Sequence, residues 1–149
     1  LTAIYADVSQ TQAALADRLR TPPDVPPPVY REYPFALAPD SPRYAAAATC
    51  SEQMIDGTVR DMDGQPTDAL NITVWGDYLD AQTVPTGELA GQDAGRWRVT
   101  LSGPANRRVF VQLHAAGRYL SAPVELVFDA TDCARNRATV DFVQIAPLQ

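Results

Sequence analysis

The sequence contains no lysine, and its twelve basic residues, all arginines, are outnumbered by 18 acidic residues. A net charge of −6 excludes the concentrated positive charge by which proteins bind nucleic-acid phosphates, so we expect no nucleic-acid partner. No apolar run approaches the ~20 residues that a membrane-spanning helix needs. No signal peptide is present and the chain begins at Leu1, which leaves an upstream signal peptide or membrane anchor open.

Residues that carry chemistry are also scarce. His114 is the only histidine, and alone it forms neither a catalytic triad nor a zinc site. Phosphate-binding and dinucleotide-binding glycine motifs, a nucleophile elbow and Cys-x-x-Cys are all absent. We therefore expect no catalytic residues, no cofactor, no metal and no enzymatic activity. Two acidic groups would suit Ca²⁺ or paired carboxylates, but we interpret them as a turn and a solvated loop: Asp61, Asp63 and Asp68, and Asp77, Asp80, Glu88 and Asp93.

Only two cysteines are present, Cys50 and Cys133. An even number without a cluster of metal ligands favours one disulfide, although two buried thiols in a cytosolic protein would give the same count. A bridge between them would close a loop of roughly 80 residues and stabilise the fold by about 4–5 kcal/mol. Such a bond persists in oxidising compartments, so the pair predicts an exported, extracellular protein.

Residues 1–21 form a first segment, which contains no proline, unlike residues 22–49. Its apolar residues from Leu1 to Val8 follow a helical spacing, which predicts a short helix. Ile4, Ala6 and Val8 also alternate, so the same residues fit a short strand.

Residues 22–49 hold eight of the thirteen prolines, which excludes a helix or a central strand and predicts an extended arm. The arm also carries large apolar and aromatic side chains that a bare linker does not need. We predict that residues 1–49 contact another copy of the chain or a partner; the alternative is that the arm covers an edge of its own domain. The predicted inter-subunit contacts are Ile4, Tyr5, Val8, Tyr30, Tyr33, Phe35 and Leu37.

Residues 50–149 alternate between apolar and polar side chains and predict an all-β domain. In Arg96–Leu101, for example, Trp97, Val99 and Leu101 lie on one face. About seven short strands separated by turn signals are typical of an Ig-like β-sandwich. The predicted strands are Gln53–Arg60, Ala69–Trp75, 81–84, Arg96–Leu101, 109–113, Val124–Phe128 and Ala138–Ile145. The predicted core comprises Ile72, Val74, Trp97, Val99, Leu101, Val111, Leu113 and Phe142.

The stretch "IDGTVRDMDGQPTDALNITVWG" resembles the opening of carboxypeptidase regulatory-like domains, which are also described as transthyretin-like or prealbumin-like sandwiches. The stretch "AGRWRVTL" is similar to the next element of that family, and the resemblance covers about residues 53–144. The acidic excursion from Asp77 to Gly95 is longer than the family pattern. The matching positions of the first stretch are Gly57, Val59, Asp61, Gly64, Pro66, Ile72 and Val74.

A proline-rich segment before a cysteine and such a domain also resembles exported, Chloroflexota-type surface proteins of this family. That resemblance implies a cell-surface location without catalysis. Our leading hypothesis is a non-enzymatic structural module of an extracellular assembly, such as a filament, that associates with itself or with a partner surface protein. The alternatives are an accessory domain on a stalk beside an enzyme or receptor, and a carbohydrate-binding module with Trp75 and Tyr78 as glycan contacts. Asn71 begins an N-glycosylation sequon and should point outward.

Overall fold

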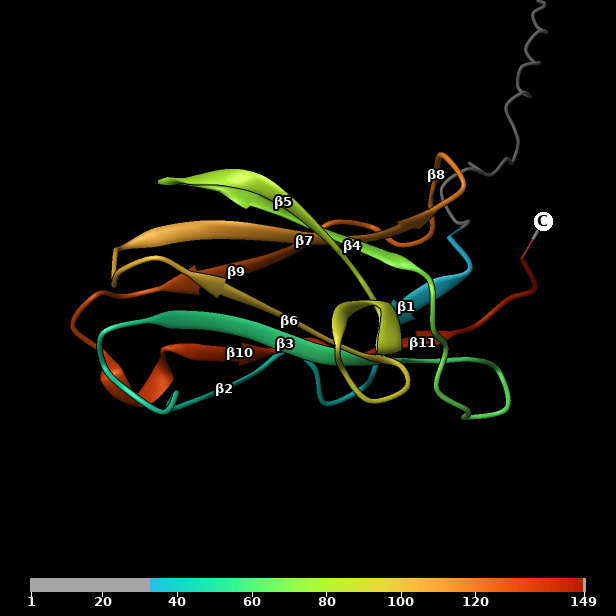
Figure 1. Cartoon of the computed structure of the whole chain (residues 1–149), viewed down its shortest axis with the longest axis horizontal. Helices are drawn as coiled ribbons and strands as arrows, with labels where there is room; N and C mark the ends of the chain where they lie inside the picture. The colour runs from blue at the N-terminus through green and yellow to red at the C-terminus, as the bar shows by residue number, and fades with distance from the viewer. Residues whose placement is uncertain (1–32, 149) are drawn as a thin grey trace, which may run out of the picture. The chain divides into compact units, whose positions relative to one another are not determined.

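A computed structural model describes residues 33–148 of the 149. The predicted helix in residues 1–21 lies outside the described residues, as do the predicted contacts Ile4, Tyr5, Val8 and Tyr30. Within the described part the chain is all-β: two sheets pack face to face, and the helical turns are two short 3₁₀ segments, η2 (Gly87–Ala90) and η3 (Cys133–Arg135) (Figure 1).

The first sheet has six strands arranged around β3 (Gln53–Arg60). One side of β3 pairs with β6 (Arg96–Leu101). Its other side pairs in parallel with β10 (Arg137–Thr139) and then with β11 (Phe142–Gln144). Two short strands complete the sheet by antiparallel pairing, β2 (Arg43–Ala45) on β10 and β1 (Phe35–Leu37) on β11.

The second sheet has five strands arranged around β7 (Arg107–Ala115). One side of β7 pairs with β4 (Asn71–Gly76), which in turn pairs with the end strand β5 (Leu79–Pro85). The other side pairs with β9 (Val124–Phe128) at one end and with β8 (Arg118–Tyr119) at the other. Each sheet therefore has one undivided end strand, β5 or β6. The opposite side is divided between β8 and β9 in the five-stranded sheet, and between the pairs β10–β2 and β11–β1 in the six-stranded sheet.

The core lies between the two sheets and follows from the period-2 alternation of the strands. Along β6 the buried residues Trp97, Val99 and Leu101 alternate with exposed Arg96 and Arg98. Every predicted core residue is buried, which confirms the inward and outward assignment of these strands: Ile72, Val74, Trp97, Val99, Leu101, Val111, Leu113 and Phe142.

The predicted last strand, Ala138–Ile145, is divided into β10 and β11 by Val140 and Asp141. At this break a side chain takes over the role of a backbone carbonyl. The Oδ1 atom of Asp141 accepts hydrogen bonds from the Thr58 backbone N–H at 3.0 Å and from the Thr58 hydroxyl at 2.9 Å. The Asp141 carboxylate therefore accepts the Thr58 N–H where no neighbouring strand carbonyl does. Because this N–H stays paired, the chain can pass from β10 to β11 without an unsatisfied backbone group on β3.

The sandwich begins at about residue 33 rather than at residue 50, because β1 and β2 both precede Cys50. Phe35 is 2% exposed and lies in the core of its own chain, and Leu37 packs against that core. For these two residues the structure therefore differs from the expected contact with a neighbouring subunit and follows the alternative in which the arm covers its own domain. The described prolines of this segment allow it because they lie outside the two short marginal strands: Pro34 precedes β1, and Pro39 and Pro42 lie between β1 and β2.

Candidate functional site

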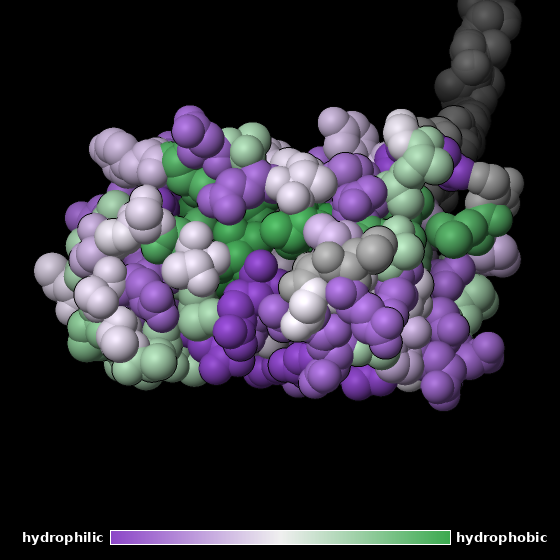
Figure 2. Space-filling view, in the orientation of Figure 1, coloured by the Kyte–Doolittle hydropathy of each residue, from purple (hydrophilic) through white to green (hydrophobic). Residues whose placement is uncertain are grey.

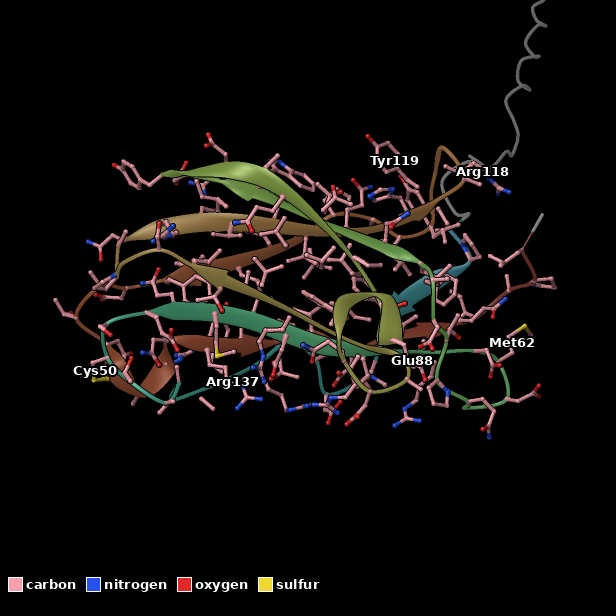
Figure 3. All side chains as sticks on the ribbon, in the orientation of Figure 1. Cys50, Met62, Glu88, Arg118, Tyr119 and Arg137 are labelled. Atoms are coloured by element: carbon pink, nitrogen blue, oxygen red, sulfur yellow. A yellow bond between two sulfur atoms is a disulfide. The ribbon has the colours of Figure 1, made fainter. Side chains whose placement is uncertain are left out.

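The two cysteines form the predicted disulfide, with a Cα–Cα distance of 5.3 Å (Figure 3 labels Cys50). The bond joins the segment that precedes β3 to η3, which precedes β10. It therefore fastens two strands that pair in parallel and whose residues are far apart in the sequence. A disulfide is consistent with an extracellular location.

A pocket of about 410 Å³ lies on the outer face of the five-stranded sheet. The floor comes from β4 and β7, because Thr73 and Trp75 alternate with core residues of β4 and Gln112 and His114 do the same on β7. Ala81 of β5 contributes from one side. The remaining lining residues belong to the β7–β8 hairpin: Gly117, Arg118 and Tyr119.

The β7–β8 hairpin forms one wall of this pocket. Its two loop residues, Ala116 and Gly117, both have positive φ angles, of 52° and 75°. Two positive angles in a two-residue loop give the tight turn whose twist matches paired strands. The turn places Tyr119 opposite His114, and the Tyr119 side chain remains 64% exposed (Figure 3).

Hydrogen bonds organise the polar part of the pocket. The Thr73 hydroxyl lies 2.8 Å from the Thr83 hydroxyl and 2.6 Å from Nε2 of His114. Gln112 is 6% exposed, and its Nε2 donates to the Ser121 carbonyl oxygen at 2.9 Å. His114 is thus a hydrogen-bonded strand histidine, as expected, and neighbouring polar groups hold the side chains of the pocket in place.

Trp75 is the predicted glycan contact that the structure places in this pocket. Its ring stacks on Phe110 of the neighbouring strand, with centroids 5.6 Å apart and planes inclined by 22°. Phe110 does not line the pocket, so the pocket is bounded by the part of the indole that Phe110 leaves uncovered. The stack fixes the orientation of the indole before any ligand arrives.

Tyr78, the other predicted glycan contact, lies apart from the pocket in the turn between β4 and β5. Its side chain is 78% exposed, and its carbonyl oxygen accepts a hydrogen bond from Arg107 at 3.3 Å. Arg107 is buried and also donates to the carbonyl oxygens of Ser102 and Gly103. Desolvation by burial lowers the pKa of Arg107 from its ordinary value.

The alternation of β4 predicts that Trp75 points outward, but it does not reveal the partners of Trp75. Gln112 and His114 follow β4 by about 40 positions in the sequence, and only the β4–β7 pairing brings them beside Thr73 and Trp75. Tyr119 depends on the β7–β8 hairpin, which the sequence did not predict. The Asp61 turn, in contrast, is confirmed, because Oδ1 of Asp61 accepts the backbone N–H groups of Asp63 and Gln65.

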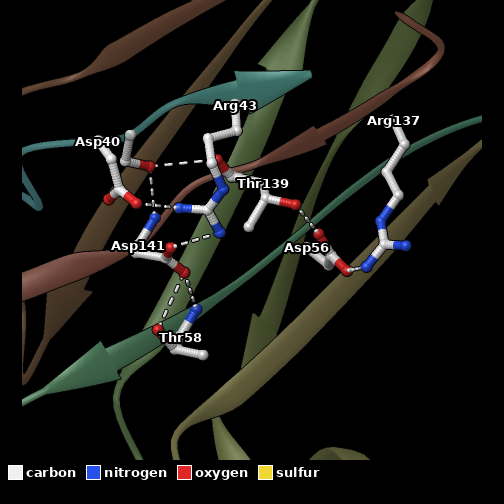
Figure 4. A network of polar contacts seen from close by, with 8 residues as sticks. Asp40, Arg43, Asp56, Thr58, Arg137, Thr139 and Asp141 are labelled. Atoms are coloured by element: carbon white, nitrogen blue, oxygen red, sulfur yellow. Dashed lines mark hydrogen bonds and ion pairs between the residues drawn. The ribbon is translucent and has the colours of Figure 1, made fainter. Parts of the chain in front are cut away.

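A second, charged hollow of about 430 Å³ lies on the outer face of the six-stranded sheet. Figure 4 shows that the carboxylates of Asp56, which is buried, and of Asp141, which is half-buried, already have partners. Asp56 accepts from Arg137 at 2.5 Å and from the Thr139 hydroxyl at 2.8 Å. Asp141 pairs with Arg43 at 3.1 Å in addition to its bonds with Thr58. We interpret this network as a structural connection between β2, β3 and β10.

Among residues 33–148 there is no group of three or more histidine, cysteine or acidic side chains placed to hold a metal ion. The same residues contain no helix long and apolar enough to cross a membrane.

No protein-family model and no curated protein matches the sequence. Membership of the carboxypeptidase regulatory-like family is therefore not shown. Several solved structures match the chain at low identity. The first is the C-terminal fragment of a pilus adhesin from Lactobacillus rhamnosus GG, with a TM-score of 0.46, 12% identity, and coverage of 66% of this chain and 47% of that fragment.

The second is the dioxygenase domain of a dioxygenase carbohydrate-binding protein fusion from Streptomyces sp. SirexAA-E, with a TM-score of 0.40, 17% identity, and coverage of 84% of this chain and all of that domain. The third is chlorocatechol 1,2-dioxygenase from Pseudomonas putida, with a TM-score of 0.35, 15% identity, and coverage of 91% of this chain and 76% of the enzyme. At these scores the likenesses say nothing about activity or ligands. The chain is a disulfide-linked β-sandwich that distantly resembles these proteins, and it spans about half of the adhesin fragment.

Proposed function

We propose that this chain is a non-enzymatic interaction module at the cell surface and a subunit of an extracellular assembly such as a filament. In this proposal the sandwich is of the carboxypeptidase regulatory-like kind. Residues 1–32, which carry Ile4, Tyr5, Val8 and Tyr30, contact a neighbouring subunit. The exposed strand β5 supplies the surface to which a neighbour adds.

The observation that carries the proposal is the exposed edge of β5. This seven-residue strand ends its sheet and, within residues 33–148, pairs with β4 alone. Four consecutive residues, from Asp80 to Thr83, are exposed, and Asp80 is the only charged residue of the strand. An edge of this kind presents unpaired backbone N–H and C=O groups to which another strand can add.

The end strand of the other sheet provides a contrast. β5 and β6 face each other on one side of the sandwich (Figure 1). β6 carries the exposed arginines Arg96 and Arg98, which is one way in which proteins protect an edge from unwanted pairing. β5 has little such protection, so we assign the contact to β5.

Apolar surface borders the exposed edge. Leu79 and Val84 of β5 are partly buried and pack against the core. Figure 2 shows apolar side chains in the seam between the layer that contains β5 and the layer that contains β6. A strand added along β5 would cover part of this seam, which adds apolar burial to the backbone hydrogen bonds.

The disulfide supports the extracellular part of the proposal, since such bonds form and persist outside reducing compartments. The bond also suits a module that functions outside the cell, because it stabilises the folded domain even when no partner or ligand is bound.

The experiment compares two Gln→Lys variants of the full chain. Gln82 lies opposite Val74, so its side chain leaves β5 on the core-facing side of the sheet, where a charge blocks edge pairing. Gln82→Lys should abolish polymers in negative-stain electron microscopy and leave the melting temperature nearly unchanged, because Gln82 is exposed. Gln65→Lys introduces the same charge in the exposed β3–β4 turn and should assemble like the parent chain.

A parent chain that stays monomeric at every concentration tested would refute the proposal and favour the accessory domain. Assembly that persists in Gln82→Lys would show that β5 is not the contact.

A further inference from the structure

We propose that the pocket on the outer face of the five-stranded sheet binds a neutral carbohydrate, with the flat face of a pyranose ring against Trp75 and Tyr119. The inference goes beyond the assembly role and does not depend on it. The pocket lies on the outer face, whereas the proposed assembly contact is the β5 edge.

The aromatic groups of the pocket suit a sugar ring. A pyranose has apolar C–H faces and polar hydroxyls at its rim, and rigid aromatic rings offer large contact areas at low entropic cost. Trp75 is held by its stack on Phe110, so little ordering is needed when a ligand binds. Tyr119 stands at the other side of the pocket on the β7–β8 hairpin and exposes most of its ring.

The polar groups between the two aromatic residues suit hydroxyl ligands. Gln112 is buried and held through the hydrogen bond from its Nε2 to the Ser121 carbonyl oxygen, and a carboxamide is a group that hydrogen-bonds sugar hydroxyls. Thr73 and His114 are joined at 2.6 Å, and hydroxyl and imidazole groups can both donate and accept. Sites for small ligands combine a mainly apolar lining with a few fixed polar groups in this way.

The charge and size of the pocket restrict the ligand further. No carboxylate lines the pocket, and Arg118 is the only lining residue with a permanent charge. A volume of about 410 Å³ lies within the range of roughly 300–1,000 Å³ that is typical of small-molecule sites. The pocket is open on the sheet surface, so a chain of sugars can continue beyond it. We therefore assign a neutral oligosaccharide as the ligand class.

The two tryptophans provide a direct readout. Trp97 is 1% exposed in the core, whereas Trp75 lines the pocket, so a ligand in the pocket should change the fluorescence of Trp75. The full chain is titrated with neutral hexasaccharides: β-1,4-glucan, β-1,3-glucan, β-1,4-mannan and β-1,4-xylan. We expect at least one of them to give a saturable change.

Three alanine variants locate the site. Tyr119→Ala removes an exposed ring and should leave the fold intact while it weakens binding by about tenfold or more, as expected when an aromatic anchor is removed. Trp75→Ala should weaken binding similarly when it is measured by calorimetry. Tyr78→Ala is the matched control, because this tyrosine is also mostly exposed but lies outside the pocket, and the affinity of this variant should equal that of the parent.

Two outcomes would overturn the inference. One is the absence of a saturable response to all four oligosaccharides. The other is binding that is lost in Tyr78→Ala but kept in Tyr119→Ala. If Trp75→Ala fails to fold, the comparison of Tyr119→Ala with Tyr78→Ala still tests whether the ligand binds in the pocket. Both side chains are exposed, so neither substitution should prevent folding. A polymer that assembles normally but binds no sugar would leave the proposed assembly role intact, and a monomer that binds sugar would refute that role alone.

Discussion

Thr58 and Asp141 are joined twice, since one carboxylate oxygen of Asp141 accepts both the backbone N–H and the hydroxyl of Thr58. The pair lies where β10 gives way to β11, so it connects β3 to both strands. We predict that Asp141→Ala lowers the free energy of unfolding by about 1–3 kcal/mol in urea denaturation, because the half-buried amide of Thr58 loses a charged acceptor. Asp141→Asn keeps an oxygen there and should cost less. Equal losses would mean that the ion pair with Arg43 is the main contribution.

Gly57 should tolerate no side chain. A Cβ atom at this position would overlap the backbone carbonyl of Val140 and press on Nε1 of Trp97. We expect Gly57→Ala to prevent folding or to lower the melting temperature by far more than a surface substitution would. Gly64→Ala is the control, because a Cβ atom at Gly64 would meet open space. Its only cost is the positive φ of 81°, which should lower the free energy of unfolding by about 1 kcal/mol. A parent-like melting temperature for Gly57→Ala would mean that β3 and the β10–β11 break lie further apart.

Removal of the disulfide should destabilise the sandwich without changing its fold. The chain-entropy model gives about 4–5 kcal/mol for a closed loop of this length, measured as the difference in unfolding free energy between the parent and the Cys50→Ser/Cys133→Ser variant. Alkylation without a reductant, followed by mass spectrometry, should label neither cysteine of the parent. Labelling of both in freshly isolated protein would contradict the bond and weaken the argument for export.

The two tryptophans should contribute very differently to stability. Trp97→Ala creates a cavity in the core and should cost about 3–5 kcal/mol in chemical denaturation. Trp75→Ala removes a ring from the outer face and should cost much less. A reversed order would mean that the sheets present the opposite faces to the core, because a one-residue slip exchanges them.

Two deletions should separate the roles of the N-terminal residues. Deletion of residues 1–32 leaves every described strand in place and should keep the melting temperature while it prevents assembly. Deletion of residues 1–49 also removes β1 and β2, and with them the buried Phe35, so it should destabilise the domain strongly. Equal melting temperatures for the two products would mean that β1 and β2 contribute nothing to the sandwich.

The sequence predicted the long strands well because their patterns are local. The predicted bounds of Gln53–Arg60, Arg96–Leu101 and Val124–Phe128 agree with β3, β6 and β9. Alternation alone decides which residues of such strands are buried. The strands β1 and β2 of the proline-rich segment were harder to predict, because proline argues against central strands but not against short strands at the margin of a sheet.

The pocket could be predicted only in part, for a different reason. Trp75 is visible as an outward aromatic on an alternating strand. Its neighbours Gln112 and His114 depend on the β4–β7 pairing, which spans two intervening strands and leaves no local pattern. Tyr119 depends on the β7–β8 hairpin, whose two-residue turn at Ala116 and Gly117 was not recognised as a hairpin signal. Tyr78, the other predicted glycan contact, lies in the turn between β4 and β5 and does not line the pocket.

The position of the disulfide has a mechanical consequence. A force that pulls on both ends of the chain reaches Cys50 and Cys133 before it reaches the strands between them, and the bond then carries the load. Among the described strands, β1, β2, β10 and β11 lie outside the closed loop and can be peeled away and extended, while the 83-residue separation between the cysteines adds no length. β3, β4, β6 and β7, together with the outer-face pocket, would keep their covalent closure under tension. A sandwich linked in this way can lengthen by a fixed amount at its ends while the strands between the cysteines stay closed in one covalent loop.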